Sequence, residues 1–161
     1  MNALDLAMEM EKDGEKYYRH LADKTANTGL KNILGMLAGD EAKHFQVLQK
    51  LKNSARAELL STPILSKSKS IFQLLREKKN WTDLPTSQID LYKKAREIET
   101  RSFKFYMDKA KENSDPATKK MFFLIAEEEK RHEFLLDHIL KFVSRPQTWL
   151  ENAEFNHLDQ Y

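Results

Sequence analysis

Apolar side chains recur at intervals of three and four residues in four separate stretches of the chain. In the second stretch, for example, Ile33, Leu37 and Leu48 fall on one side of a helix. This spacing is typical of helices that bury one side and expose the other. The pattern predicts four long helices, at residues 3–25, 30–54, 87–112 and 116–143.

Short polar segments separate the helices of each pair. Residues 25–29, TANTG, interrupt the first stretch, and Thr28 is expected to cap the helix that follows. Residues 113–116, NSDP, are expected to end the third helix and to begin the fourth at Asp–Pro, since Pro116 suits the first turn of a helix. Pro146 is expected to end the last helix. Two antiparallel hairpins are therefore predicted.

The segment at residues 55–85 is much longer than the other two connections. Connections in simple bundles hold about 2–8 residues, whereas this one is several times longer and includes a short amphipathic stretch at 70–78. A segment of this length can run along the whole bundle. The predicted fold is therefore all-α, a four-helix bundle in which two antiparallel hairpins are joined by a crossover.

Two of the apolar stripes contain the same polar pair. Glu41 is followed three residues later by His44, and Glu129 by His132, with 88 positions between the two pairs. Other identities recur at the same shift, which indicates a duplicated hairpin. These are Ala7 and Ala95, Glu9 and Glu97, Glu11 and Glu99, Tyr18 and Tyr106, Ala22 and Ala110, Ala38 and Ala126, and Leu48 and Leu136.

The turns place the polar residues at one level. Glu11 and Glu41 are equidistant from the first turn, and Glu99 and Glu129 from the second, with 30 positions between the members of each pair. Equidistant residues of an antiparallel hairpin lie at the same height, here about 20 Å from the turn. Residues three apart share a helix face, so each histidine joins its glutamate. Six polar residues are expected to converge: Glu11, Glu41, His44, Glu99, Glu129 and His132.

A metal site explains this convergence. A single Glu–His pair at this spacing is usually a surface hydrogen bond, but both pairs here lie on apolar stripes, where an uncompensated charge costs several kcal/mol. Four carboxylates at one level also repel one another. Two divalent cations neutralise the four negative charges, while the imidazoles remain neutral. The sequence therefore predicts a two-metal centre held by the six residues.

Composition narrows the remaining possibilities. The 161 residues contain no cysteine, which excludes disulfides, thiol catalysis and cysteine-bound iron centres. A net charge of +2 gives no reason to expect nucleic acid as a partner. No run approaches the ~18 apolar residues of a membrane span, and the acids from Asp5 onward argue against an export signal. We expect a cytoplasmic protein that binds no membrane.

The ligand pattern resembles that of ferritin-like di-metal carboxylate bundles, in which two helices each supply a Glu and two supply Glu-x-x-His. Within that group, residues 3–143 are similar to rubrerythrin-type proteins, through AMEMEKDGEKYYRHLA and AREIETRSFKFYMDKA in particular. The resemblance implies that Glu41 and Glu129 bridge two metals. It implies that one metal is completed by Glu11 with His44, and the other by Glu99 with His132.

The sequence differs at three points from the rubrerythrins and bacterioferritins that it resembles. Peroxide-reducing rubrerythrins usually have a further ligand glutamate where this chain has Ser102, and usually carry a cysteine-rich rubredoxin domain. The six-residue set is closer to the ferroxidase centre of bacterioferritins, but those proteins have a haem-ligating Met where this chain has Ala42. We therefore expect an external electron donor and no haem.

Four other acids are second choices for the site. Glu9 and Glu97 repeat like the ligands but are expected to face solvent. Glu128 could share the face of His132, and Glu128 and its repeat counterpart Asp40 suit a position behind the ligands.

Four further residues are assigned by their spacing from the ligand glutamates. Tyr18 and Tyr106 are possible neighbours of the centre, although such tyrosines are more often simply core. His20 and His138 are expected at the surface.

The leading hypothesis is a di-iron oxidoreductase that reacts with hydrogen peroxide or dioxygen. The alternative is an iron-binding, ferroxidase-type protein that handles iron without a dedicated substrate. Carboxylates and imidazoles suit iron or manganese. We expect residues 1–145 to form the bundle domain, the tail at 146–161 to pack on the bundle or on a partner subunit, and the protein to be a homodimer.

Overall fold

The computed structural model describes residues 2–53, 59, 64–78 and 86–144. The four long predicted helices are confirmed, with ends within two residues of those expected. A fifth, shorter helix lies between the two hairpins. The helices are α1 (Ala3–Lys24), α2 (Thr28–Lys52), α3 (Ile64–Lys78), α4 (Thr86–Glu112) and α5 (Pro116–Ser144).

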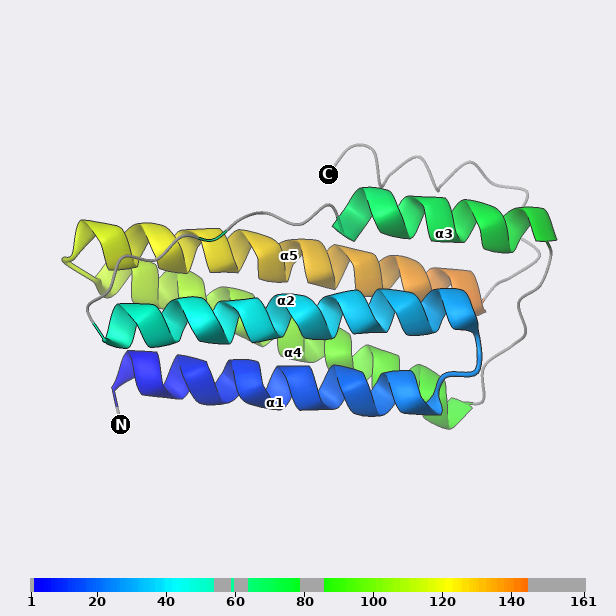
Figure 1. The fold of residues 1–161 in the computed structure, drawn as a ribbon, viewed down its shortest axis with the longest axis horizontal. Coiled ribbons are helices and arrows are strands. Elements are labelled where there is room, and N and C mark those ends of the chain that lie inside the picture. The colour runs from blue at the N-terminus through cyan, green and yellow to red at the C-terminus, as the bar shows by residue number, and fades with distance from the viewer. Residues whose placement is uncertain (1, 54–58, 60–63, 79–85, 145–161) are drawn as a thin grey trace.

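The topology is the predicted pair of hairpins with a crossover. Helices α1 and α2 lie antiparallel, as do α4 and α5, and α2 ends at the opposite end of the bundle from the start of α4 (Figure 1). The connection between them therefore travels the length of the bundle. It contains α3, which begins at Ile64 and not near residue 70, because Ile64, Leu65 and Ile71 all pack on the bundle core.

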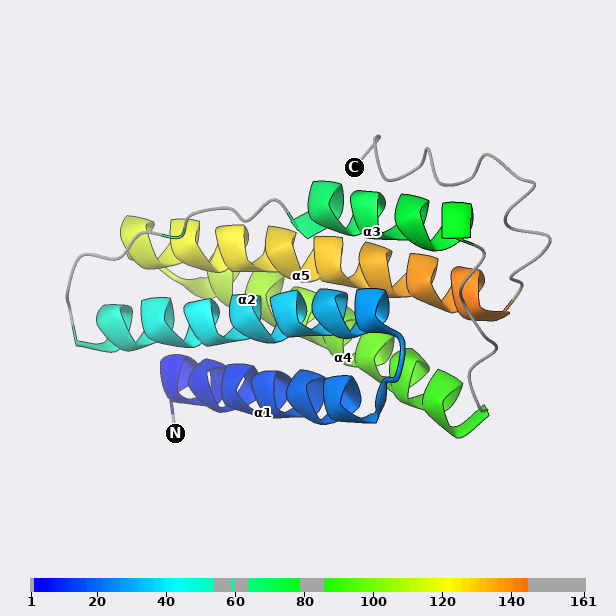
Figure 2. The same ribbon diagram turned by 45° about the vertical axis from the view of Figure 1, so that its right-hand side comes forward.

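Helix α3 makes the bundle asymmetric. It lies outside the four long helices (Figure 2), and the long helix that it mainly contacts is α2. Ile64 of α3 belongs to the same apolar cluster as Leu135 and Ile139 of α5 and Leu34 of α2. One hairpin of the repeat therefore has an extra helix against it that the other lacks.

The helix starts are fixed by side-chain caps. Asn27, and not the predicted Thr28, caps α2, since its side-chain oxygen accepts the backbone N–H of Leu30 at 3.0 Å. The Asp–Pro start of α5 is confirmed, because the Asp115 carboxylate accepts the backbone N–H of Thr118 at 3.0 Å. Both contacts satisfy donors that the first turn of a helix leaves unpaired.

The apolar core is divided into two clusters along the bundle. One cluster lies toward the α1–α2 turn and includes Leu34, Tyr92 and Leu136; the other lies toward the opposite end and includes Leu48 and Phe122. All five side chains are fully buried. The layer between the two clusters contains the polar residues that the repeat predicts.

The structure bears on the expected lack of a membrane-spanning helix but not on the C-terminal tail. Across the helices that the structure describes, none combines the length and apolarity that a bilayer crossing requires. The predicted stop at Pro146 and the packing of the tail at 146–161 lie outside the described residues.

The Asn27 cap generates a stability prediction. Asn27→Ala removes the oxygen that satisfies the Leu30 N–H, and we expect the free energy of unfolding to fall by about 1 kcal/mol. Urea denaturation of the metal-free protein measures the change. The matched control is Asn32→Ala, an exposed position inside α2 where alanine favours the helix. Equal stability of the two variants would contradict the capping role.

Candidate metal centre

The six predicted residues meet in the polar layer between the two apolar clusters. Each long helix contributes to the group: α1 and α4 one glutamate each, and α2 and α5 a glutamate and a histidine each. Every member is at most 3 % exposed. The members are Glu11, Glu41, His44, Glu99, Glu129 and His132.

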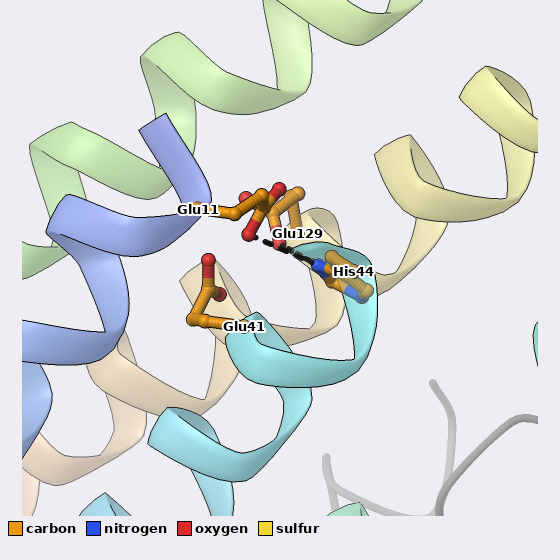
Figure 3. Close-up of side chains that lie close together, drawn as sticks. All are labelled: Glu11, Glu41, His44 and Glu129. Carbon is orange, nitrogen blue, oxygen red and sulfur yellow. Dashed lines mark hydrogen bonds and ion pairs between the residues drawn. The ribbon is translucent and has the colours of Figure 1, made fainter. Parts of the chain in front are cut away.

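The six residues form two overlapping groups. In the first, Glu11, Glu41, His44 and Glu129 each offer one ligand atom, and these atoms lie within 4.8 Å of one another (Figure 3). In the second, Glu41, Glu99, Glu129 and His132 do the same. Glu41 and Glu129 belong to both groups. The arrangement therefore has two adjacent positions for a cation that share two carboxylates.

Both imidazoles direct the same ring nitrogen at the carboxylates. Nδ1 of His44 lies 3.3 Å from Glu11 Oε2 and 3.3 Å from Glu129 Oε1. Nδ1 of His132 lies 3.3 Å from Glu99 Oε1. The two rings are nearly parallel, with centroids 6.1 Å apart. The two halves of the centre are therefore related by an approximate two-fold arrangement.

The buried carboxyls strongly influence one another. Burial raises the pKa of Glu41 well above its usual value, and the charges of Glu11 and Glu129 raise it further. Burial and the charge of Glu99 likewise raise the pKa of Glu129. Burial opposes ionisation of Glu11 too, but the charge of His44 and the hydrogen bonds with Glu41, His44 and Tyr106 together outweigh it and lower the pKa of Glu11. Without a cation, the shared carboxyls therefore retain protons more readily than free glutamates.

The histidines respond in the opposite sense. Burial lowers the pKa of His44, but the charge of Glu11 and the hydrogen bonds to Glu11, Glu128 and Glu129 together raise it well above its usual value. Burial also lowers the pKa of His132, and the charges of Glu99 and Glu129 with the hydrogen bonds to Asp40 and Glu99 together raise it well above its usual value. Protons on these rings therefore stand in for the positive charge that the acids require.

The residues around the centre leave its carboxylates incompletely satisfied. Oε2 of Glu99 is buried and accepts no hydrogen bond from the part of the chain that the structure describes, and such an atom costs about 1–3 kcal/mol. Oε1 of Glu41 and Oε1 of Glu129 are also buried, with a histidine Nδ1 at ion-pair distance, 3.2 Å away in His132 and 3.3 Å away in His44 respectively. Carboxylate oxygens with imidazole nitrogens are a donor set that iron and manganese accept, so the residues present fit two divalent cations.

Tyr18 and Tyr106 contact the centre across the bundle. The hydroxyl of Tyr18, on α1, donates a hydrogen bond to Glu99 Oε1 on α4. The hydroxyl of Tyr106, on α4, donates to Glu11 Oε1 on α1 at 2.6 Å. Burial and the nearby acids raise both tyrosine pKa values well above the usual range, so both hydroxyls remain donors. Each tyrosine therefore holds a glutamate of the opposite hairpin.

The second-choice acids separate into two classes. Glu9 and Glu97 are exposed, as expected, and lie away from the centre. Asp40 and Glu128 are buried behind the histidines, at hydrogen-bonding distance from their Nε2 atoms.

Gly14 is a site residue that the sequence reasoning missed. It is buried on α1, three residues after Glu11, and a Cβ at this position would lie 3.0 Å from Glu41 Oε2. Its repeat counterpart is Ser102, which is buried on α4. The available signal was a glycine inside a helix, on the same face as a ligand glutamate. The absence of a side chain leaves room for the Glu41 carboxylate.

The surface prediction holds for His20 and is wrong for His138. His20 is exposed. His138 is buried: its ring packs on Phe134 with centroids 4.4 Å apart, and its Nδ1 lies 3.1 Å from the Phe134 carbonyl oxygen. The spacing from Glu129 correctly directs His138 away from the centre. It does not predict exposure, because the spacing along one helix contains no information about what packs on its other sides.

Comparisons with known proteins agree with the geometry. No curated protein and no solved structure matches the chain. The family model described as Rubrerythrin matches residues 2–140, which include all six residues of the centre and the two tyrosines. The chain belongs to the rubrerythrin family.

Proposed function

We propose that the protein is a di-iron oxidoreductase that reduces hydrogen peroxide or dioxygen. One observation carries the proposal: two overlapping groups of buried carboxylates and imidazoles share Glu41 and Glu129. Four carboxylates and two ferrous ions sum to zero charge, so a loaded centre removes the repulsion that the empty arrangement would contain.

The residues divide between two metal positions. The α1–α2 site consists of Glu11 and His44, and the α4–α5 site consists of Glu99 and His132. Glu41 and Glu129 would bridge the two positions. This division is supported by the distances from each Nδ1 to the acids of its group. Manganese would fit the same donors, and the sequence motifs give no reason to expect haem.

The protein would hold the ligand carboxylates in place and keep bulk water away from the metal ions. Two bound ferrous ions would provide the two electrons that reduce an oxygen–oxygen bond. Tyr18 and Tyr106 hold the carboxylates of Glu99 and Glu11 in fixed orientations. The apolar clusters on both sides of the polar layer keep bulk water away, which strengthens electrostatic interactions inside it.

Electrons must return to the centre from another molecule. The chain contains no cysteine, and therefore no rubredoxin-type centre or thiol within it. We infer an external electron donor and a small-molecule oxidant as the partners. We also propose that the protein acts as a homodimer.

A ferroxidase-type role in iron handling is the second candidate. It is favoured by Ser102, which occupies the position where peroxide-reducing relatives usually have a further ligand glutamate. A serine hydroxyl is a poor ligand for ferrous iron beside carboxylates. In this role the centre would oxidise ferrous iron and release it, with iron as the substrate.

Removal of a bridging carboxylate should remove metal. We expect the wild-type protein, purified without added metal, to contain close to two metal ions per chain and Glu41→Ala and Glu129→Ala to lose nearly all of it, since each glutamate serves both positions. Elemental analysis measures the content. Glu9→Ala and Glu97→Ala, at exposed repeat positions, are matched controls. Full metal content in the bridging variants would refute the ligand assignment.

Metal binding should release protons. The raised pKa values of His44, His132, Glu41 and Glu129 mean that the metal-free centre holds protons that a cation must displace. We therefore expect the apparent affinity for Co²⁺ to increase as the pH rises from about 6 to 8. Calorimetry in two buffers of different ionisation enthalpy counts the protons. A pH-independent affinity without proton release would contradict this electrostatic account.

Kinetics distinguish the two candidate functions. For the oxidoreductase, we expect the anaerobic ferrous protein to consume one equivalent of hydrogen peroxide per centre within the mixing time, with both irons retained afterwards. Stopped-flow absorbance and subsequent metal analysis test this. Slow reaction with peroxide, together with continued oxidation and release of added ferrous iron, would instead favour the ferroxidase role.

A further inference from the structure

Two buried acids contact the imidazoles of the centre from behind. Asp40, on α2, places Oδ2 2.9 Å from Nε2 of His132 on α5. Glu128, on α5, places Oε1 3.0 Å from Nε2 of His44 on α2. The two acids are 4 % and 7 % exposed. Each of them therefore contacts the histidine of the opposite hairpin, although it is close in sequence to the histidine of its own.

These contacts select the ring nitrogen that is free to bind a metal. An ionised carboxylate can only accept, so Nε2 of each histidine must donate. In the neutral ring the lone pair then lies on Nδ1, which faces the glutamates of the centre. Imidazole ligands generally donate their second N–H in this way, and loss of the acceptor typically costs about 10- to 100-fold in metal affinity.

The two contacts are equivalent although the acids differ. Asp40 and Glu128 occupy corresponding positions of the repeat, 88 residues apart, and Glu128 is longer by one methylene. Both nevertheless lie within 0.1 Å of the same distance from an Nε2 atom, 2.9 and 3.0 Å. The repeat therefore makes the same carboxylate–imidazole contact with two acids of different length.

We propose that Asp40 and Glu128 are positioning residues that act across the bundle. Asp40 of the first hairpin sets the affinity of the α4–α5 site, and Glu128 of the second hairpin sets the affinity of the α1–α2 site. The inference rests on the proposed function, because it requires two metal positions. The opposite assignment follows from sequence proximity, since Asp40 lies four residues before His44 and Glu128 four residues before His132.

Single-site proteins can separate the two assignments. Glu11→Ala leaves the α4–α5 site intact, and Glu99→Ala leaves the α1–α2 site intact. Asp40→Ala and Glu128→Ala are then added one at a time to each protein, and Co²⁺ binding is titrated by visible absorption. The Asp40→Asn and Glu128→Gln changes retain an acceptor oxygen without the charge, and circular dichroism checks that each variant is folded.

The expected result is a crossed pattern. In the Glu11→Ala protein, Asp40→Ala should lower the Co²⁺ affinity about 10- to 100-fold, whereas Glu128→Ala should change it by less than about 3-fold. In the Glu99→Ala protein the effects should be reversed. Asn and Gln should restore part of the lost affinity. A general loss of structure would instead weaken the remaining site equally for either acid.

The outcomes also separate this inference from the proposed function. If the wild-type protein binds two Co²⁺ ions but the pattern is uncrossed, equal or absent, the crossed assignment alone is wrong. If an alanine variant unfolds, the same pattern with smaller changes is required of Asp40→Asn and Glu128→Gln, and its absence overturns the assignment. If the wild-type protein fails to bind two ions, the proposed function fails and this inference fails with it.

Discussion

Mutual repulsion among four buried carboxylates is the constraint on which the rest of the structure depends. Glu11, Glu41, Glu99 and Glu129 lie at one level of the bundle and are at most 3 % exposed. Neither water nor surface lysines can neutralise them there, and burial of an unpaired charge costs several kcal/mol. Protons, imidazoles and tyrosine hydroxyls compensate in part. The Glu99 oxygen that accepts no hydrogen bond within the described residues marks compensation that a cation would supply.

The polar contacts around the centre also connect the two hairpins. Tyr18 reaches Glu99, Tyr106 reaches Glu11, and each outer acid reaches the histidine of the other hairpin. One hairpin alone could offer a glutamate and a Glu-x-x-His pair, but not the hydrogen bonds that orient them. Formation of the centre is therefore coupled to the docking of the hairpins, and metal binding stabilises the same interface.

The surroundings of the centre are less symmetric than the centre itself. The outer groove of the first hairpin contains Met8 and Phe45, whereas the corresponding positions of the second are Arg96 and Glu133. Arg96 there pairs with Asp137 at 2.7 Å. Gly14 of the first hairpin corresponds to Ser102 of the second, and α3 lies against only one side of the bundle. The two metal positions therefore have similar donors in different environments.

Much of this protein could be predicted from local sequence because local rules govern it. Helical period, turn residues and the equal spacing of Glu11–Glu41 and Glu99–Glu129 about their turns depend only on backbone geometry, and they predicted the helices, the crossover and the six residues that meet.

The remaining features depend on how neighbouring helices rotate against each other. That tertiary arrangement decides that Tyr18 and Asp40 contact the opposite hairpin, that Gly14 faces Glu41 and that His138 is buried. The first two features are contacts between residues far apart in the chain, the third joins two helices of one hairpin, and the period of a single helix contains no information about the rotation of its neighbour.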